Sequence, residues 1–143
     1  MVDKSIRFNP KQLHLQLISE GNIYQQVWSK TRLRVAFYQV KRNKGSYGVD
    51  RISINQYERN LERNIREVSR LLKEKRYQPL PVKRIWIPKP DGKQRPLGIP
   101  AVRDRVVQQS LLTVIEPLFE PIFSDCSYGF RPNRSAIEAV QRV

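Results

Sequence analysis

Residues 82–100, VKRIWIPKPDGKQRPLGIP, predict a β-hairpin around which the rest of the chain can be arranged. Strand-like residues lie on both sides of Pro90-Asp91-Gly92, which is typical of a turn. Pro90 fixes the first φ angle of that turn, and Gly92 can adopt the left-handed conformation of a bulged three-residue loop. We therefore expect an antiparallel hairpin with its turn at these three residues.

Side-chain alternation selects the register of the hairpin. A two-residue loop would place the aliphatic residues of the first strand on the same face as Gln94 and Pro96, which is a poor match. A three-residue loop gathers four aliphatic residues on one face: Ile85, Ile87, Leu97 and Ile99. The same register brings Lys89, Lys93 and Arg95 together on that face, at the tip of the hairpin.

Three cations at the end of a rigid β-arm suit an anionic ligand. Arginine offers a planar pair of donors to phosphate oxygens, and lysine offers a mobile positive charge. The alternative is a solvated tip whose charges prevent edge-to-edge aggregation. The pattern alone leaves both interpretations open.

The charge of the chain favours a polyanionic partner. Its 143 residues include 27 Lys and Arg against 13 Asp and Glu, for a net charge of +14. Such an excess predicts salt-sensitive binding to nucleic acid, with an anionic membrane surface as the alternative. No apolar run is long enough to span a membrane, and the N-terminus lacks the apolar core of a secretion signal. A single cysteine and a single histidine predict neither a disulfide nor a zinc site, so we expect a cytoplasmic protein.

The remaining segments predict a mainly helical α+β fold. Residues 1–22 are expected to form a loosely held arm. Residues 23–40 are expected to form a helix whose apolar stripe begins with Ile23, Val27 and Trp28 and can continue through Val35, Ala36 and Val40. A longer helix begins at Ser53, which forms a capping box with Gln56. Its core stripe is predicted to contain Ile54, Tyr57, Leu61, Ile65, Val68 and Leu72.

Two basic loops and a third helical region complete the prediction. The loop at residues 43–50 has two glycines, with Lys44 offering a charge and Tyr47 a stacking ring. A helix is expected after residue 100, and Pro117 and Pro121 are expected to kink or end it. Its predicted apolar face consists of Val102, Val106, Leu111 (or Val107), Val114, Ile115 and Leu118. After an aromatic, basic loop at 124–134, Ser135 caps a last short helix with Glu138 as its box partner. Because that helix has nothing downstream to pack against, we expect the chain to be a fragment, incomplete at its C-terminus.

The run YQPLPVKRIWIPKPDGKQRPLGIPAVRDRVVQQSLLTVIEPLFEPIFSDCSYGFRPNRSA resembles the fingers region of bacterial group II intron reverse transcriptases (maturases). The preceding NKGSYGVDRISINQYERNLE resembles the N-terminal extension of the same family. The resemblance covers about residues 24–143. It implies that residues 23–81 form the helical N-terminal extension and residues 82–143 the fingers region of a right-hand polymerase. The given sequence is then expected to stop before the palm.

The resemblance also implies roles for individual residues. Lys89 and Arg95 match the basic pair that binds the triphosphate of the incoming deoxynucleotide. Other residues are expected to contact RNA: Lys83, Arg84, Lys93, Lys44, Tyr47, Arg131 and Arg134. The segment 45–50 matches a lid-like loop near the template–primer junction, and 128–132 matches the second fingers motif, which is expected to combine template contact with packing.

The catalytic carboxylates of the family lie on palm strands beyond the second fingers motif, where they hold two metal ions. None of the five aspartates of this chain is adjacent to another carboxylate or in a matching motif, so no catalytic or metal residue is expected here. Mg²⁺ is expected for the complete enzyme, with intron or template RNA, an RNA/DNA duplex and a deoxynucleoside triphosphate as partners. The first hypothesis is therefore a fingers fragment that binds RNA and nucleotide without catalysing. The second is a free-standing basic RNA-binding module without polymerase activity. A basic membrane-surface module is a remote third.

Overall fold

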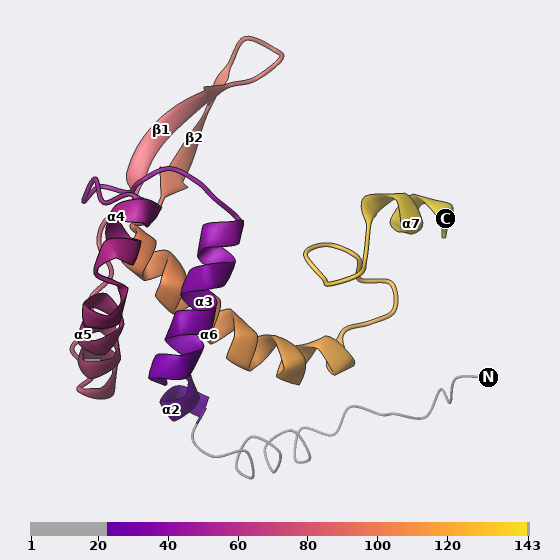
Figure 1. The fold of residues 1–143 in the computed structure, drawn as a ribbon. Helices are drawn as coiled ribbons and strands as arrows, with labels where there is room; N and C mark the ends of the chain where they lie inside the picture. Colours follow the sequence, from indigo (N-terminus) through magenta and orange to yellow (C-terminus); the bar gives the residue numbers. More distant parts are fainter. Residues whose placement is uncertain (1–22, 143) are drawn as a thin grey trace.

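The structure, a computed structural model, describes residues 23–142 (Figure 1), so the predicted arm at residues 1–22 lies outside the described residues. The elements follow in the order α2 (Ile23–Val27), α3 (Lys30–Arg42), α4 (Ile54–Arg59), α5 (Leu61–Lys73), β1 (Lys83–Pro88), β2 (Gln94–Ile99), α6 (Val102–Phe119), the 3₁₀ turn η1 (Glu120–Ile122) and α7 (Ala136–Gln141). The prediction of a mainly helical fold with one antiparallel hairpin is confirmed within this part of the chain.

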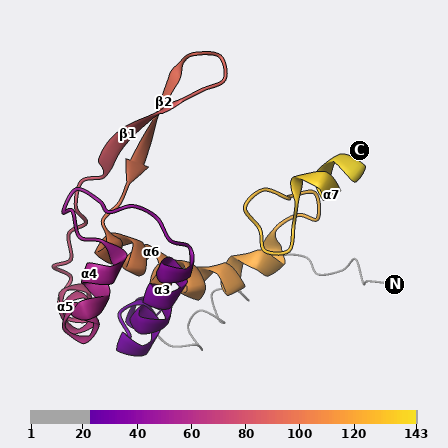
Figure 2. The same cartoon turned by 45° about the horizontal axis from the view of Figure 1, so that its top comes forward.

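The core lies where α3 and α5 pack against the first half of α6. Leu33, Phe37 and Ile65 are fully buried there, and Val102 and Val106 meet them from α6. The buried positions of α3 are spaced three and four residues apart, which is the period of a helix with one face in a core. The hairpin leaves this core at the N-terminal end of α6 and stands away from it in both views (Figures 1 and 2).

The prediction of one helix over residues 23–40 is wrong, because the helix breaks after Val27. Two buried serines from distant helices stabilise the break: Ser110 Oγ donates to the Val27 carbonyl at 2.7 Å, and Ser69 Oγ donates to the Trp28 carbonyl at 2.7 Å. In the second helix, Ala36 and Val40 of the predicted stripe are buried, whereas Val35 is 53% exposed. Leu33 and Phe37, which were not predicted, are buried in its place.

The capping box of the next helix is confirmed, with the Gln56 amide N–H donating to Ser53 Oγ at 3.2 Å and the Ser53 N–H donating to Gln56 Oε1 at 2.8 Å. The predicted stripe is confirmed as well: Tyr57, Ile65, Val68 and Leu72 are buried, and Ile54 and Leu61 pack against them. A break at Asn60 nevertheless divides the predicted helix into α4 and α5.

Helix α6 continues through Pro117 and ends at Phe119, two residues later. Apart from Asp104, its buried positions repeat every four residues and include a serine: Val102, Val106, Ser110, Val114 and Leu118. Leu111, one of the predicted stripe positions, is 43% exposed. The capping box of α7 between Ser135 and Glu138 is confirmed.

The predicted hairpin register is confirmed. Ile85 pairs with Leu97, Ile87 pairs with Arg95, and the Lys89 N–H donates to the Lys93 carbonyl at 2.7 Å across the turn. Gly92 has φ +79°, as the bulged three-residue loop requires. Hydrogen-bonded and non-hydrogen-bonded pairs alternate along the ribbon, starting from the hydrogen-bonded Lys89–Lys93 pair. Pro88 and Pro96 therefore belong to non-hydrogen-bonded pairs, where an N–H would point out of the ribbon. Both edges of the ribbon are thereby blocked against a further strand.

Candidate nucleic-acid interface

The three predicted tip cations lie on one face of the ribbon. Because Lys89, Lys93 and Arg95 are an even number of residues apart along paired strands, their side chains leave the same side. All three are exposed, and within residues 23–142 none of them is in an ion pair. Asp91 in the turn accepts from the Lys93 backbone N–H at 3.1 Å. The tip therefore presents three positive charges to solvent.

The loop at residues 43–50 packs beside the base of the same face. Gly48 is buried there, so close to Pro100 and Ala101 that a Cβ would come within 2.6 Å of the Ala101 backbone. The Arg105 guanidinium of α6 donates to the Ser46 carbonyl at 2.7 Å. These contacts fix the loop across the foot of the hairpin, where Figure 1 shows it passing.

The two predicted binding residues of this loop differ in their surroundings. The Tyr47 ring lies 3.9 Å from the Nζ of Lys83, a predicted RNA-binding residue of β1. Lys44 lies farther along the loop, with φ 56°, and its backbone carbonyl accepts from Arg105 at 3.4 Å. The structure thus brings Tyr47 and Lys83 together at the base of the cationic face.

Lys83 and Arg84 were predicted to share one role, but they point to opposite faces of the ribbon. Neighbouring strand residues alternate sides, so Lys83 lies on the face of the tip cations and Arg84 on the other. The hairpin therefore has two distinct faces, each with positive charge.

The loop at residues 124–134 lies beyond the other end of α6 (Figure 2) and carries two predicted RNA-binding residues, Arg131 of the second fingers motif and Arg134. Helix α6, which lies between this loop and the hairpin in the chain, has 18 residues and is therefore about 27 Å long. Arg131 forms an ion pair with Glu120 at 2.8 Å and donates to the Ser124 and Ser127 carbonyls, with 8% of its side chain exposed. Its contacts hold the loop together, whereas Arg134 lies over the Tyr128 ring, 5.2 Å from its centroid.

A buried carboxylate that the sequence analysis did not identify fixes the other side of the hairpin base. Asp104, 3% exposed in the first turn of α6, accepts a hydrogen bond from the Tyr77 hydroxyl and one from the Leu80 N–H at 3.1 Å. Burial, followed by the hydrogen bond to Asp104, raises the pKa of Tyr77. The neighbouring Arg103 donates to the Gln78 carbonyl at 2.7 Å. The sequence signal that could have identified Asp104 is its position as an acidic residue in the first turn of a helix.

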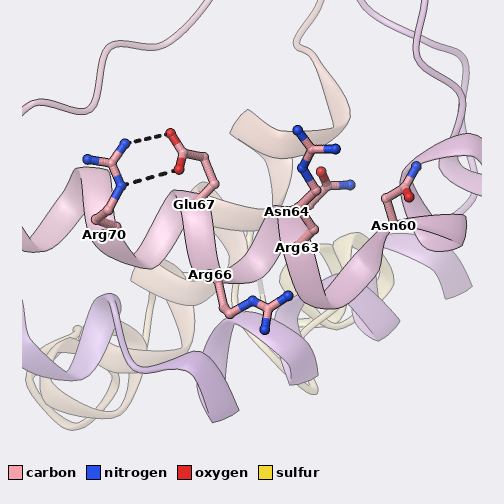
Figure 3. A pocket seen from close by; sticks show the side chains of 6 residues that line it. All are labelled: Asn60, Arg63, Asn64, Arg66, Glu67 and Arg70. Atoms are coloured by element: carbon pink, nitrogen blue, oxygen red, sulfur yellow. Dashed lines mark hydrogen bonds and ion pairs between the residues drawn. The ribbon is translucent and has the colours of Figure 1, made fainter.

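A second cationic surface lies on the outer side of α5 (Figure 3). A hollow of about 670 Å³ is lined there by Asn60, Arg63, Asn64, Arg66, Glu67 and Arg70. Glu67 pairs with Arg70 at 2.8 Å, whereas Arg63 and Arg66 have no ion pair in the described part of the chain. The Glu67–Arg70 pair shows that acidic and basic side chains alternate on this face of α5.

Residues 23–142 contain no cluster of three or more His, Cys, Asp and Glu that could hold a metal ion. No helix within the same range combines the length and apolar character needed to cross a membrane.

The hairpin carries a cationic tip and has no carboxylate in either strand. Known proteins contain related sequences. No protein-family model matches the chain. Protein YkfC of Escherichia coli (strain K12) is 57% identical over 67 residues, which are 47% of this chain and 18% of that protein. Group II intron-encoded protein LtrA of Lactococcus lactis subsp. cremoris is 40% identical over 83 residues, which are 57% of this chain and 14% of LtrA. An uncharacterized 91 kDa protein in the cob intron of Schizosaccharomyces pombe is 30% identical over 130 residues, 89% of this chain and 16% of that protein.

The chain is therefore homologous to group II intron-encoded proteins over part of their chains, and the recognition made from the sequence motifs is confirmed. The matches span less than a fifth of the length of each of these relatives.

Proposed function

We propose that this chain is the N-terminal and fingers part of a group II intron-type RNA-directed DNA polymerase. In this role the hairpin tip binds the triphosphate of the incoming deoxynucleotide, and the surface around the hairpin base binds template or intron RNA. The observation that carries the proposal is the placement of Lys89, Lys93 and Arg95 on one face of a single ribbon. The homology to group II intron-encoded protein LtrA supports it.

The geometry of the tip suits a triphosphate because its charges leave one face of neighbouring paired positions and have no ion pair within residues 23–142. A nucleoside triphosphate carries several negative charges in a short chain, and arginine can bind two phosphate oxygens at once. Lys89 and Lys93 face each other across the turn, with Arg95 two residues farther along β2. The carboxylates that hold Mg²⁺ in such a polymerase would be supplied by the palm.

A nucleotide titration tests the triphosphate assignment. The chain is joined to the palm and thumb of a group II intron-encoded relative, and the KM for deoxynucleotide is measured for Lys89→Ala and Arg95→Ala. Loss of a hydrogen bond to a charged group costs about 1.5–3 kcal/mol, so each variant should raise the KM roughly 10- to 150-fold. Arg63→Ala, which removes one cation from α5, is the charge-matched control and should leave the KM unchanged. A change in template affinity without a change in nucleotide KM would show the assignment to be wrong.

Salt dependence tests RNA binding by the chain alone. Four cations share the face of the hairpin that carries the tip, and in the absence of nucleotide all four are open to RNA phosphates: Lys83, Lys89, Lys93 and Arg95. If each neutralises one phosphate, log K should fall against log salt with a slope of about −2.8 for single-stranded RNA. The double variant Lys89→Ala/Arg95→Ala should reduce that slope by about 1.4. An equal reduction in Arg63→Ala/Arg66→Ala would mean that RNA binds over the whole basic surface and not at the hairpin.

The alternative of a free-standing RNA-binding module predicts the same salt dependence. The two functions separate in the joined polymerase, because a module that only binds RNA contributes nothing to nucleotide KM. Lys89→Ala and Arg95→Ala would then lower RNA affinity and leave the nucleotide titration unchanged.

A further inference from the structure

The hairpin face opposite the tip cations carries a tryptophan that the described part of the chain leaves uncovered. Trp86 is 57% exposed, although tryptophan is highly buried on average. The register places it directly across from Pro96 and on the same side as Arg84 and Pro88. We name this side the Trp face; its members, all exposed, are Arg84, Trp86, Pro88, Gln94, Pro96 and Gly98.

The backbone of the Trp face is stiff and closed to strand addition. Pro88 and Pro96 have fixed φ angles and no N–H at the two outer edges of the ribbon. An extended peptide could not form a continuous ladder with either strand, which disfavours a protein partner that binds by adding a strand. An occupant of the Trp face therefore has to contact its side chains.

The charge of the hairpin selects the chemistry of that occupant. β1 and β2 contain no carboxylate, and Asp91 in the turn is the one acidic residue of the stretch 82–100. Trp86 thus presents an aromatic ring beside Arg84 on a ribbon whose other face carries the tip cations. A ligand that combines planar rings with regularly spaced negative charges complements this surface, and single-stranded nucleic acid has both features.

We propose that the Trp face binds an unpaired base of single-stranded RNA, with the base stacked on Trp86 and an adjoining phosphate held by Arg84. This inference rests on the proposed RNA binding and adds a second contact surface to it. The tip cations then bind phosphates on one face of the ribbon while the Trp face holds a base on the other.

The chain offers a direct optical test, because it contains two tryptophans, Trp28 and Trp86. The variant Trp28→Phe leaves Trp86 as the one source of tryptophan emission. Single-stranded RNA should quench this emission, and a blunt-ended duplex of the same sequence should leave it nearly unchanged, because its bases are already stacked. Trp86→Ala should weaken single-strand binding roughly 5- to 10-fold, the low end of the range for one base–aromatic stack.

Two further variants make the test decisive. Trp86→Phe keeps an aromatic ring and should retain most of the affinity, which separates stacking from any loss of fold in Trp86→Ala. Tyr38→Ala removes an aromatic ring that is 52% exposed on α3 and should leave binding unchanged. RNA binding with undiminished Trp86 emission and unaltered affinity in Trp86→Ala would overturn the stacking and leave the proposed function standing. Absence of any RNA binding at low salt would overturn both.

Discussion

Replacing Gly48 with alanine places a methyl group against the backbone that joins the hairpin to α6. The new Cβ would lie 2.6 Å from both the N and the Cα of Ala101, and 2.9 Å from the carbonyl carbon of Pro100. Carbon atoms normally approach to about 3.5–4.0 Å, so the loop and this segment must separate by about 1 Å. Ala101 is fully buried at the start of α6, and the loop is therefore the part that has to move.

The cost of that movement has two sources. Overpacking a fitted site costs about 1–3 kcal/mol. Displacement of the loop also stretches the 2.7 Å hydrogen bond from Arg105 to the Ser46 carbonyl, which is worth about 1 kcal/mol. We expect Gly48→Ala to lower the free energy of unfolding by about 2–4 kcal/mol and the Tm by roughly 5–15 °C, measured by urea and thermal denaturation.

Two other glycines provide controls. A Cβ on Gly129 would meet no atom within 4 Å, and Gly129→Ala should leave stability unchanged. Gly92 also has open space but a φ of +79°, so Gly92→Ala should cost about 1–2 kcal/mol through backbone strain alone. If Gly48→Ala were as stable as Gly129→Ala, the close approach of the loop to Ala101 would be refuted.

Four further predictions concern buried polar groups. The Tyr57 hydroxyl is buried without a hydrogen-bond partner in the described structure, so Tyr57→Phe should raise the free energy of unfolding by about 1 kcal/mol in urea denaturation at pH 7. Tyr77→Phe leaves Asp104 without its hydroxyl donor and should lower the free energy of unfolding by about 1–2 kcal/mol in the same assay. Burial raises the pKa of Tyr57 to about 12, while the unfolded chain ionises near 10. This one hydroxyl should therefore lower the free energy of unfolding by about 1.4 kcal/mol per pH unit from pH 10 to 12, and urea titrations of Tyr57→Phe should lack this contribution. Arg131→Ala leaves Glu120 and two loop carbonyls without their donor. Backbone hydrogen exchange should therefore become faster in the loop at residues 124–131 and stay unchanged in α3.

The sequence predicts the hairpin well because its determinants are local. Alternation along the strands and the Pro90-Asp91-Gly92 turn are enough to select the three-residue register that the structure has. The capping box at Ser53 is local in the same sense, since it depends on residues three apart. Features of this kind can be read from a few neighbouring residues.

The break between α2 and α3 could not be predicted in this way. It depends on Ser69 and Ser110, which lie 41 and 83 residues from the carbonyls that they bind. No residue near Val27 signals that its carbonyl accepts from a distant hydroxyl. Locally, the apolar spacing favours one continuous helix, and the tertiary hydrogen bonds override it.

The candidate site likewise contains features that depend on neighbouring residues and features that depend on distant tertiary contacts. The shared face of Lys89, Lys93 and Arg95 follows from strand parity, and parity also separates Lys83 from Arg84, which the family resemblance had grouped. Predicting the role of Asp104 would have required knowledge that the segment before the hairpin returns to the first turn of α6.

The first turn of α6 sets the direction of the cationic tip. Asp104 holds the segment that enters β1, Arg105 holds the loop across the hairpin base, and Ala101 packs against Gly48 where β2 ends. Strands of six residues extend about 20 Å, so a tilt of 3° at this base moves the tip by about 1 Å. Because a 1 Å misplacement is enough to weaken a positioned contact, Gly48→Ala should impair triphosphate binding as well as stability, although it removes no charge. If the tip bound its ligand as a loose cluster of charges, nucleotide KM in the joined polymerase would stay unchanged in this variant at temperatures where it remains folded.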